Sequence, residues 1–434
     1  MVKTEKIPKG YLATEAGILP VDWQVKRLSE VATELTERAG QDKYETVSIS
    51  AGIGFVNQAE KFGKELSGKQ YEKYIVLHQG DFSYNKGNSK TSPQGCIYRL
   101  NDRETAAVPN VFESFRIEGQ NADYYEQLFL SGFLNKQLYS KINRGVRDDG
   151  LLNLTGKDFY SCTVPVPPIA EQKKIAEVLS CCDRVIELKQ QLIAELQRLK
   201  SGFLQTMFPA KGHREPDIRF PEFSDAWEQR KLGEVLIGLQ NNTLSRANLS
   251  SEQGIAKNVH YGDILVKFGE VIDVKTESLP MIADEAVIAK YQSSFLQNGD
   301  VILADTAEDE TVGKCTEIAG LGDEIVISGL HTIPYRPVRK FASGYLGYYM
   351  NSASFHNQLL PLMQGIKVTS ISKTALQNTD IIYPKSATEQ EDIGKYFCQL
   401  DNLVTLHQRG LEETKKKKKS LAKLLLTGSV RVPT

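Results

Sequence analysis

Two long stretches of the chain carry apolar residues at alternating spacings of four and three, the pattern of a helix that pairs with another helix. In the first stretch, after Glu171-Gln172, the apolar positions are Ile175, Leu179, Cys182, Ile186, Ile193, Leu196, Phe203 and Met207. Lys189 and Lys200 occupy the two remaining positions of this seam. The pattern predicts one continuous helix of about 37 residues, roughly 55 Å long. Taken alone, such a helix could equally be a core helix.

The second stretch, after Glu389-Gln390, repeats the first without a gap at an offset of 393 − 175 = 218. Its seam positions are Ile393, Phe397, Leu400, Val404, Leu411, Thr414, Leu421 and Leu425. His407 and Lys418 fall where Lys189 and Lys200 fall, and Asp401 matches Asp183. A helix this long needs a partner along its length, and its own repeat supplies one. We therefore expect the two helices to pair as an antiparallel coiled coil.

The rest of the chain also divides into two matching halves. Trp23–Val31 and Trp227–Val235 both read W-x-x-x-x-L-x-E-V, at an offset of 227 − 23 = 204. Three further pairs keep the same order in both halves: Gly80-Asp81 with Gly299-Asp300, Gly145-Val-Arg147 with Gly365-Ile-Lys367, and Val164-Pro165 with Ile382-Tyr-Pro384. The sequence thus predicts an internal pseudo-two-fold repeat.

Strand-like and helical patterns mix within each half, so we expect an α+β (mixed α/β) fold for both. The expected architecture is two globular domains separated by the two long helices. Proline, glycine and charged residues between the first helix and Trp227 indicate a linker. The expected segments are a domain at 1–168, a helix at 169–208, the linker at 209–226, a second domain at 227–386 and the second helix at 387–428.

Composition narrows the class of protein only slightly. The net charge of −1 neither favours nor excludes a nucleic-acid partner, because local patches do the binding. No apolar run approaches the length of a membrane span, and the first residues lead into no signal-like apolar stretch. The six cysteines form no C-x-x-C pair and have no histidine cluster nearby, which fits a reducing cytoplasm and argues against a metal site.

Motifs of covalent chemistry are missing from the sequence. A DNA methyltransferase needs an [N/D]-P-P-[Y/F] turn, and Pro165–Ile169 lacks its leading residue. Gly313-Lys314-Cys315 lacks the first glycine and the hydroxyl residue of a phosphate-binding loop. The six histidines are scattered, and we find no nuclease-like acid cluster. We therefore expect no catalytic residue in this chain.

In the first half, the segment from Ser83 to Pro93 combines an aromatic ring, amides, lysines and hydroxyls, which suits contact with phosphates and base edges. A second basic group of residues surrounds the Gly145 turn. The candidate DNA-binding residues here are Tyr84, Asn85, Lys86, Asn88, Lys90, Lys141, Arg144 and Arg147. The alternatives are a solvated hairpin tip for the loop and a helix C-cap for the turn.

In the second half, the matching loop Asp305–Thr311 is acidic, and a carboxylate can accept a hydrogen bond from cytosine N4. Here the candidate DNA-binding residues are Asp305, Thr306, Lys367 and Thr369. A solvated face is the alternative. If both loops read DNA, their opposite charge predicts that they read different sequences.

Five consecutive lysines, Lys415–Lys419, cover every side of the second long helix. Such a run is usually a solvated surface. It could also contact the DNA backbone between two target halves, or an acidic partner.

In this order, repeated twice, the motifs resemble the specificity subunit of type I restriction-modification systems. The resemblance rests on the openings at Trp23 and Trp227, the glycine turns at Gly145 and Gly365, and the Pro…Glu-Gln-x-x-Ile helix starts, Pro168/Glu171 and Pro384/Glu389. It covers essentially the whole chain.

The resemblance implies that the two domains are target recognition domains, each reading one half of a bipartite, asymmetric site in double-stranded DNA. The paired helices would set the spacer and help to dock two methyltransferase subunits, with two restriction subunits joining outside. Helix-pairing and subunit-interface residues would be Ile175, Leu179, Ile186, Ile193, Phe203, Ile393, Phe397, Val404, Leu411 and Leu421. No cofactor is expected on this chain, since S-adenosylmethionine, Mg²⁺ and ATP would belong to partner subunits.

Three other functions stay open. The chain could serve a methyltransferase alone, it could be an enzyme with an active site built across its two domains, or it could be a coiled-coil scaffold that binds only protein. The missing catalytic motifs count against an enzyme. Two dissimilar loop-bearing domains count against a pure scaffold, which would need only the helices.

Overall fold

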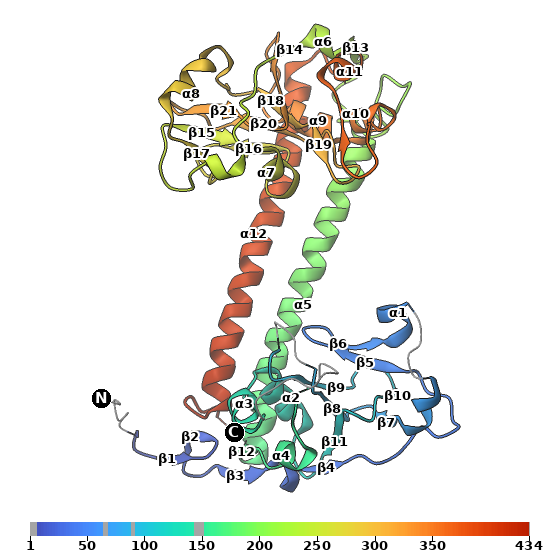
Figure 1. Ribbon diagram of the computed structural model, residues 1–434, viewed down its shortest axis with the longest axis vertical. Helices are drawn as coiled ribbons and strands as arrows, with labels where there is room; N and C mark the ends of the chain where they lie inside the picture. Colours follow the sequence, from blue (N-terminus) through green and yellow to red (C-terminus); the bar gives the residue numbers. More distant parts are fainter. Residues whose placement is uncertain (1–6, 64–67, 88–91, 143–151, 434) are drawn as a thin grey trace. The chain divides into compact units, whose positions relative to one another are not determined.

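The chain folds into two compact units that share two long helices. This computed structural model describes residues 7–63, 68–87, 92–142 and 152–433. Residues 1–190 and 410–434 form the first unit, and residues 191–409 form the second. Helix α5 (Ile169–Thr206) and helix α12 (Ala387–Leu426) each run from one unit into the other (Figure 1). Each unit therefore consists of a mixed α/β head and one segment of each long helix, which confirms the predicted fold class.

The head of the first unit is built on a four-stranded antiparallel sheet in the order β4-β11-β8-β9. Stacked and edge-on contacts among Phe82, Phe115 and Phe129 fill the core behind it. The elements are β1 (Tyr11–Thr14), β2 (Gly17–Pro20), β3 (Gln24–Arg27), β4 (Ala32–Glu34), β5 (Val47–Ser50), β6 (Gly54–Asn57), α1 (Gln58–Phe62), β7 (Ile75–His78), β8 (Phe82–Asn85), β9 (Cys96–Arg99), β10 (Thr105–Val108), β11 (Glu113–Ile117), α2 (Ala122–Leu130), α3 (Asn135–Lys141), α4 (Gly156–Tyr160) and β12 (Thr163–Val166).

The head of the second unit repeats this sheet and adds one strand, in the order β14-β22-β18-β20-β16. Strand β16 runs parallel to β20, whereas the other neighbours are antiparallel. The elements are β13 (Glu228–Lys231), α6 (Leu232–Val235), β14 (Leu236–Gly238), β15 (Ala256–Val259), α7 (Tyr261–Val266), β16 (Val271–Asp273), β17 (Met281–Ile282), α8 (Glu285–Lys290), β18 (Val301–Ala304), β19 (Thr306–Ala307), β20 (Cys315–Ala319), β21 (Ile325–Ser328), β22 (Thr332–Pro337), α9 (Tyr345–Asn351), α10 (Ala353–His356), β23 (Thr369–Ser370), α11 (Lys373–Gln377) and β24 (Asp380–Tyr383).

The W-x-x-x-x-L openings have the same structural role in both heads. Strand β3 follows Trp23 and pairs with β12, and β13 follows Trp227 and pairs with β24. The leucines that close the motif, Leu28 and Leu232, are fully buried and donate their backbone N–H groups to Cys162 and Thr379. Each opening segment therefore lies beside the strand that leads directly into a long helix.

Burial along both helices follows the predicted seam. Buried or half-buried positions recur every three or four residues, and the exposed residues fall between them. In the first unit Ile175 and Leu179 share a core with Ala422 and Leu425. The predicted seam residues Ile193, Ile393, Phe397, Val404 and Leu411 are buried, and Ile186, Phe203 and Leu421 are half-buried.

Two of the seam lysines, Lys200 and Lys418, are paired with aspartates of the facing helix. Lys200 lies 2.6 Å from Asp401 in the second unit, and Lys418 lies 2.5 Å from Asp183 in the first. The two ion pairs are copies of each other, because the repeat relates Lys200 to Lys418 and Asp183 to Asp401. The two pairs can form together only when the helices run antiparallel in this register. Polar groups at seam positions are a known means of fixing the register of paired helices.

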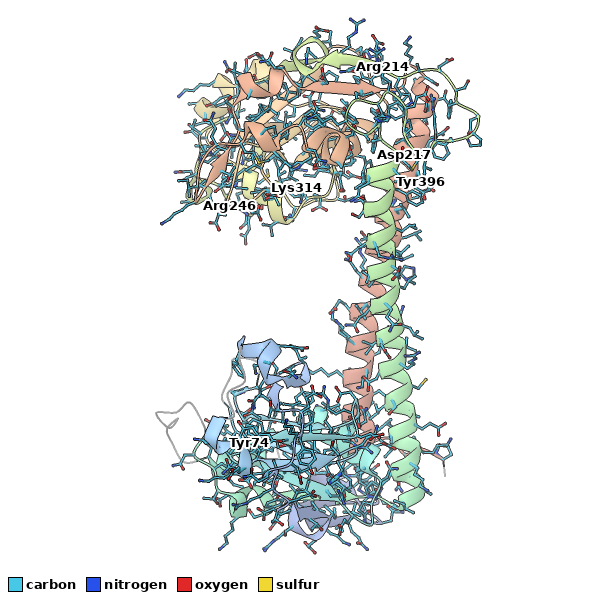
Figure 2. The ribbon with its side chains drawn as sticks, turned by 90° about the vertical axis from the view of Figure 1, so that its right-hand side faces the viewer. Tyr74, Arg214, Asp217, Arg246, Lys314 and Tyr396 are labelled. Carbon is cyan, nitrogen blue, oxygen red and sulfur yellow. The ribbon has the colours of Figure 1, made fainter. Side chains whose placement is uncertain are left out.

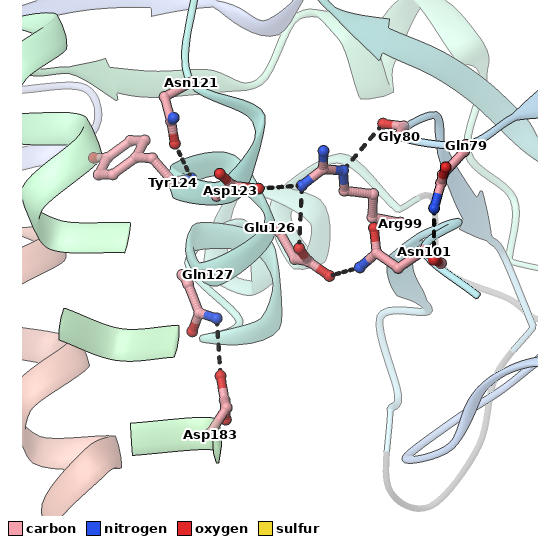
Figure 3. A network of polar contacts seen from close by, with 10 residues as sticks. All are labelled: Gln79, Gly80, Arg99, Asn101, Asn121, Asp123, Tyr124, Glu126, Gln127 and Asp183. Atoms are coloured by element: carbon pink, nitrogen blue, oxygen red, sulfur yellow. Dashed lines mark hydrogen bonds and ion pairs between the residues drawn. The ribbon is translucent and has the colours of Figure 1, made fainter. Parts of the chain in front are cut away.

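A polar network connects the first head to its segment of α5 (Figure 3). The Arg99 guanidinium of β9 pairs with Asp123 and lies 3.5 Å from Glu126, both on α2. Gln127, on the same helix, donates to Asp183 of α5 at 2.9 Å. In the second unit, the Tyr348 hydroxyl of α9 donates to the matching aspartate, Asp401, at 2.7 Å. Asp183 and Asp401 therefore each receive a hydrogen bond from the head of their own unit.

A buried carboxylate caps helix α9 in the second head. Glu317 of β20 accepts hydrogen bonds from the backbone N–H groups of Gly344 and Gly347 at 2.7 and 2.9 Å. Its side chain is almost fully buried. Burial raises the pKa of Glu317 to about 7, against the opposing effect of these hydrogen bonds.

We predict that Lys200→Met destabilises the protein more than its repeat counterpart Lys418→Met. Lys200 contacts both Asp401 and Glu270 at 2.6 Å, and its loss leaves two carboxylates without their cation. The expected cost is about 2–4 kcal/mol for Lys200→Met. We expect about 1 kcal/mol for Lys418→Met, whose partner Asp183 is 44% exposed. Urea denaturation of both variants measures this, and equal costs would contradict the assignment.

We predict that stability falls as the pH rises from about 5 to 7 because of Glu317. Its folded-state pKa of about 7 lies above the ordinary glutamate pKa of 4.5, so the folded protein holds a proton that the unfolded chain has lost. The loss between these values is of order 3 kcal/mol and ends above pH 7. Unfolding of the wild type and of Glu317→Gln across this range measures it. The same slope in both proteins would show that another group titrates.

Candidate nucleic-acid interface

The two Gly-Asp turns fix the start of the central strand in each head. Asp81 and Asp300 are both buried and accept a hydrogen bond from the backbone N–H three residues earlier, at 2.8 Å in each case. Arg116 of β11 and Arg336 of β22 bind these carboxylates through two N–H groups. A buried carboxylate needs such a partner, so this part of the frame is held constant while the loop beyond it can vary.

In both heads, the loop that follows the central strand lies against the segment that follows the glycine turn. Leu152 donates its N–H to the carbonyl of Lys86, and Ile371 donates to the carbonyl of Asp305, both at 2.9 Å. These pairs are equivalent, since 305 − 86 and 371 − 152 both equal 219. The structure therefore brings together two groups of candidate residues that are far apart in the sequence.

This meeting point is most completely described in the second head. Strand β19 pairs with β23, which places Thr306 opposite Ser370, next to Thr369. Gln364 and Ser370 exchange backbone hydrogen bonds and so close a hairpin whose tip carries Lys367. At this tip Ile366 is 102% exposed, the largest exposure among the large apolar side chains described. Gly365 has φ +117, and a Cβ there would lie 2.0 Å from the Val368 carbonyl oxygen, so the turn requires glycine.

Asp305, at the base of the acidic loop, has two polar neighbours. Its carboxylate accepts from the Thr306 hydroxyl at 2.7 Å and lies 3.2 Å from Nδ1 of His331. His331 has φ +56, the one positive value that a non-glycine residue adopts in the described part of the chain. Tyr261 packs edge-on against its ring. Strained backbone of this kind occurs frequently at binding sites.

Sequence reasoning missed His331 and Tyr261. Neither residue stands in a repeated motif, and the β21–β22 turn that brings His331 to Asp305 depends on strand pairing. The sequence carried no signal that could have identified them.

In the first head, the candidate residues that the structure describes are engaged within the domain. Tyr84 is fully buried, its ring stacks on Phe159 at 4.7 Å and its hydroxyl donates to the Gln94 carbonyl. Asn85 donates to the Ile49 carbonyl, and Lys86 pairs with Glu113 at 2.6 Å. Packing thus accounts for Tyr84, and we leave it out of the DNA-contacting set that we propose below.

The basic candidates near the first glycine turn are only partly described. Lys141, at the end of α3, donates to the Ser161 hydroxyl at 2.8 Å. Asn88, Lys90, Arg144 and Arg147 lie outside the described residues.

Each unit also holds a cavity with a basic rim. In the first unit, a cavity of about 660 Å³ is lined by Lys415, Lys418, Lys419 and Lys423 of α12, above an apolar floor that includes Phe129. In the second, a cavity of about 300 Å³ is lined by Arg246 and Lys267, and Arg246 (Figure 2) is paired with Asp263. Part of the lysine run therefore faces the first head.

No group of three or more His, Cys, Asp or Glu side chains in the described ranges is arranged to hold a metal ion. Within the same ranges, no helix is long and apolar enough to cross a membrane.

Comparison with known proteins connects this architecture to a family. Residues 20–198 match the family described as Type I restriction modification DNA specificity domain. The type I restriction enzyme MjaVIII specificity subunit of Methanocaldococcus jannaschii is 27% identical over 318 residues, 70% of each chain. The putative type I restriction enzyme MjaX specificity subunit of the same organism is 24% identical over an alignment that covers 98% of each chain.

Solved structures share the fold. A chain from a structure of type I restriction-modification complex assembly and conformational transition has a TM-score of 0.57 at 18% identity, covering 95% of this chain and 99% of that one. The S subunit of a type I system from M. genitalium has a TM-score of 0.50 at 12% identity, covering 93% and 96%. The resemblance drawn from the motifs is thus confirmed: residues 20–198 match the specificity-domain family, and the chain as a whole is similar to type I restriction enzyme specificity subunits.

Proposed function

We propose that this chain, a type I restriction-modification specificity subunit, is a non-catalytic DNA-binding subunit whose two heads each read one half of a bipartite, asymmetric site. One observation carries the proposal. In each head, the residue after the central strand meets the segment that follows the glycine turn, but the side chain at that position differs in charge. Lys86 in one head stands where Asp305 stands in the other. Two equivalent positions with unlike chemistry suit two unlike half-sites.

In the second head, the proposed contacts divide into two kinds. Asp305 and Thr306 would face base edges, because a carboxylate and a hydroxyl accept hydrogen bonds from exocyclic amines such as cytosine N4. Lys367 and Thr369, on the hairpin, would hold phosphates. His331 would orient the Asp305 carboxylate. In the first head, the residues around Asn85, Lys86 and Lys141 would form the corresponding surface.

The paired helices would set the unspecified spacer and offer docking surfaces to two methyltransferase subunits. Leu188, Leu192, Leu199, Leu403 and Leu406 are large apolar residues on these helices that stay exposed. Two restriction subunits would join outside them, and S-adenosylmethionine, Mg²⁺ and ATP would be held by the partners. The chain would act on DNA in the cytoplasm.

The proposal predicts that the chain, co-expressed with its cognate methyltransferase subunit, directs methylation to one split DNA sequence. Genome-wide methylation mapping in a host that carries both genes measures this, with a host that lacks the specificity gene as the control. The absence of a split motif dependent on this chain would refute the proposal. Restriction of unmethylated phage in the same host would distinguish a full restriction system from a methyltransferase-only complex.

Two variants of the second head should separate base reading from phosphate binding. We expect Asp305→Asn to relax the preference at one base position of one half-site by about tenfold. We expect Lys367→Gln to weaken binding to all sequences alike and to reduce the slope of log K against log salt by about 0.9. Binding of the assembled methyltransferase to a randomised site library measures both effects.

Lys340 is the matched control, because it lies beyond the end of β22 opposite to His331. Lys340→Gln should leave both measurements unchanged. A change in base preference for Lys367→Gln, or none for Asp305→Asn, would contradict the division of roles.

A further inference from the structure

Each long helix begins with a buried carboxylate that binds a tryptophan and an arginine. Glu171 of α5 accepts from the indole N–H of Trp23 at 2.9 Å, and Glu389 of α12 accepts from that of Trp227 at 3.1 Å. Both glutamates are 1% exposed. A carboxylate buried this deeply needs a cation close by.

The cation comes from the segment that follows the other helix. Arg431, after α12, binds Glu171 through Nε and Nη2 at 2.6 and 2.8 Å. Arg219, after α5, binds Glu389 through the same two atoms at 2.6 and 2.9 Å. Each guanidinium also lies over the neighbouring indole ring, at 5.8 Å from Trp23 and 6.0 Å from Trp227. The two Trp-Glu-Arg clusters, one wholly inside each unit, thus have the same construction.

Further contacts hold both arginine segments in place. In the first unit, Arg431 also pairs with Asp22, and the Tyr11 hydroxyl donates to the Gly428 carbonyl at 2.8 Å. A Cβ at Gly428 would lie 2.4 Å from Pro20, so the segment is closely packed there. In the second unit, Phe220 packs edge-on against Tyr396 of α12 (Figure 2), which also packs on Phe203 of α5.

These clusters tie three separate parts of the chain together. In each unit they join the opening of the head, the start of the helix that leaves it and the end of the helix that returns to it. Without the arginine, the end of the returning helix would lose its ion pair with the buried glutamate, and the apolar seam would remain with single polar contacts such as Lys200–Glu270. The apolar seam is less directional than a two-point guanidinium–carboxylate contact.

We propose that Arg219 and Arg431 are positioning residues, which fix the orientation of each head on its helix pair and so set the spacer length at which the two heads read DNA. The inference rests on the proposed function. One base pair of added spacer shifts a half-site by 3.4 Å along the axis and rotates it by about one tenth of a turn. A head held rigidly on its helices rejects that change, whereas a loosened head tolerates it.

The test is a library of split sites that keep both half-sites and vary the spacer, methylated by the complex of this chain with its cognate methyltransferase subunit. We expect the wild type to accept one spacer length. Arg219→Met and Arg431→Met should each raise methylation of the adjacent spacer lengths by about tenfold. The half-site bases should not change, because neither arginine binds a residue of the proposed DNA contacts. Arg198→Met is the control, since that side chain is 81% exposed on α5.

A second readout follows the cluster itself. The chain has two tryptophans, one in each cluster, so Trp227→Phe leaves Trp23 as the sole reporter. In that background Arg431→Met should shift the emission of Trp23 and expose it to acrylamide quenching, whereas Arg198→Met should not. If Arg431→Met fails to fold, Asp22→Asn weakens the arginine while leaving Glu171 paired, and should broaden the spacer preference less.

The outcomes are separable. Unchanged spacer preference in both arginine variants, with the wild type reading a split site, would overturn the positioning role and leave the proposed function intact. Unchanged Trp23 emission in Arg431→Met would show that Arg431 does not hold the cluster together. Altered half-site bases would also overturn the inference, because they would place the arginines in the reading surface. A wild type without any split site would refute the proposed function itself.

Discussion

The structure depends on two buried glutamates, one in the first turn of each long helix. A carboxylate that has lost its hydration is costly unless a cation and hydrogen-bond donors replace the lost water. Glu171 and Glu389 satisfy that demand by drawing in a tryptophan from the opening of a head and an arginine from beyond the opposite helix. The same requirement, met twice, explains why the W-x-x-x-x-L-x-E-V openings and the Glu-Gln helix starts recur together in the sequence.

The neighbouring glutamines extend this attachment to the backbone. Gln172 accepts from the N–H of Asn121 and donates to the Pro167 carbonyl. Gln390 accepts from Ala342 and donates to the Pro384 carbonyl in the same way. Asn121 and Ala342 lie just before α2 and α9. Each Glu-Gln pair therefore contacts its head at two places: the glutamate binds the tryptophan of the opening, and the glutamine binds the segment before α2 or α9. A substitution at either glutamine would leave buried backbone groups unpaired, so the motif tolerates little change.

Those features that follow from periodicity or from repeated motifs could be predicted from the sequence. The helix seam, the lysines within it and the mixed fold could be predicted, because heptad spacing determines which side chains of a helix are buried. The arginines were not identified, although Arg219-Phe-Pro221 and Arg431-Val-Pro433 do repeat, at an offset of 431 − 219 = 212. This offset differs from the 204 of the tryptophans and the 218 of the helices. Arg219 binds the head that follows it, whereas Arg431 binds the first head at the other end of the chain, so an alignment of two collinear halves does not match the two arginines.

The proposed DNA-contacting surface resists prediction for a different reason. Its residues meet through strand pairing, and a single strand does not show which of its faces is buried when both contain aromatic or polar residues. Tyr84 illustrates this, since its polar surroundings indicated an exposed loop whereas its ring fills the core against Phe159. Asp81 and Asp300 are buried carboxylates and therefore require their arginine partners. The described residues of the loops that begin four or five residues later contain no buried charge of this kind that must be paired. If the heads read two different half-sites, as we propose, selection can change the loops, while the cost of an unpaired buried charge holds the frame of both heads fixed.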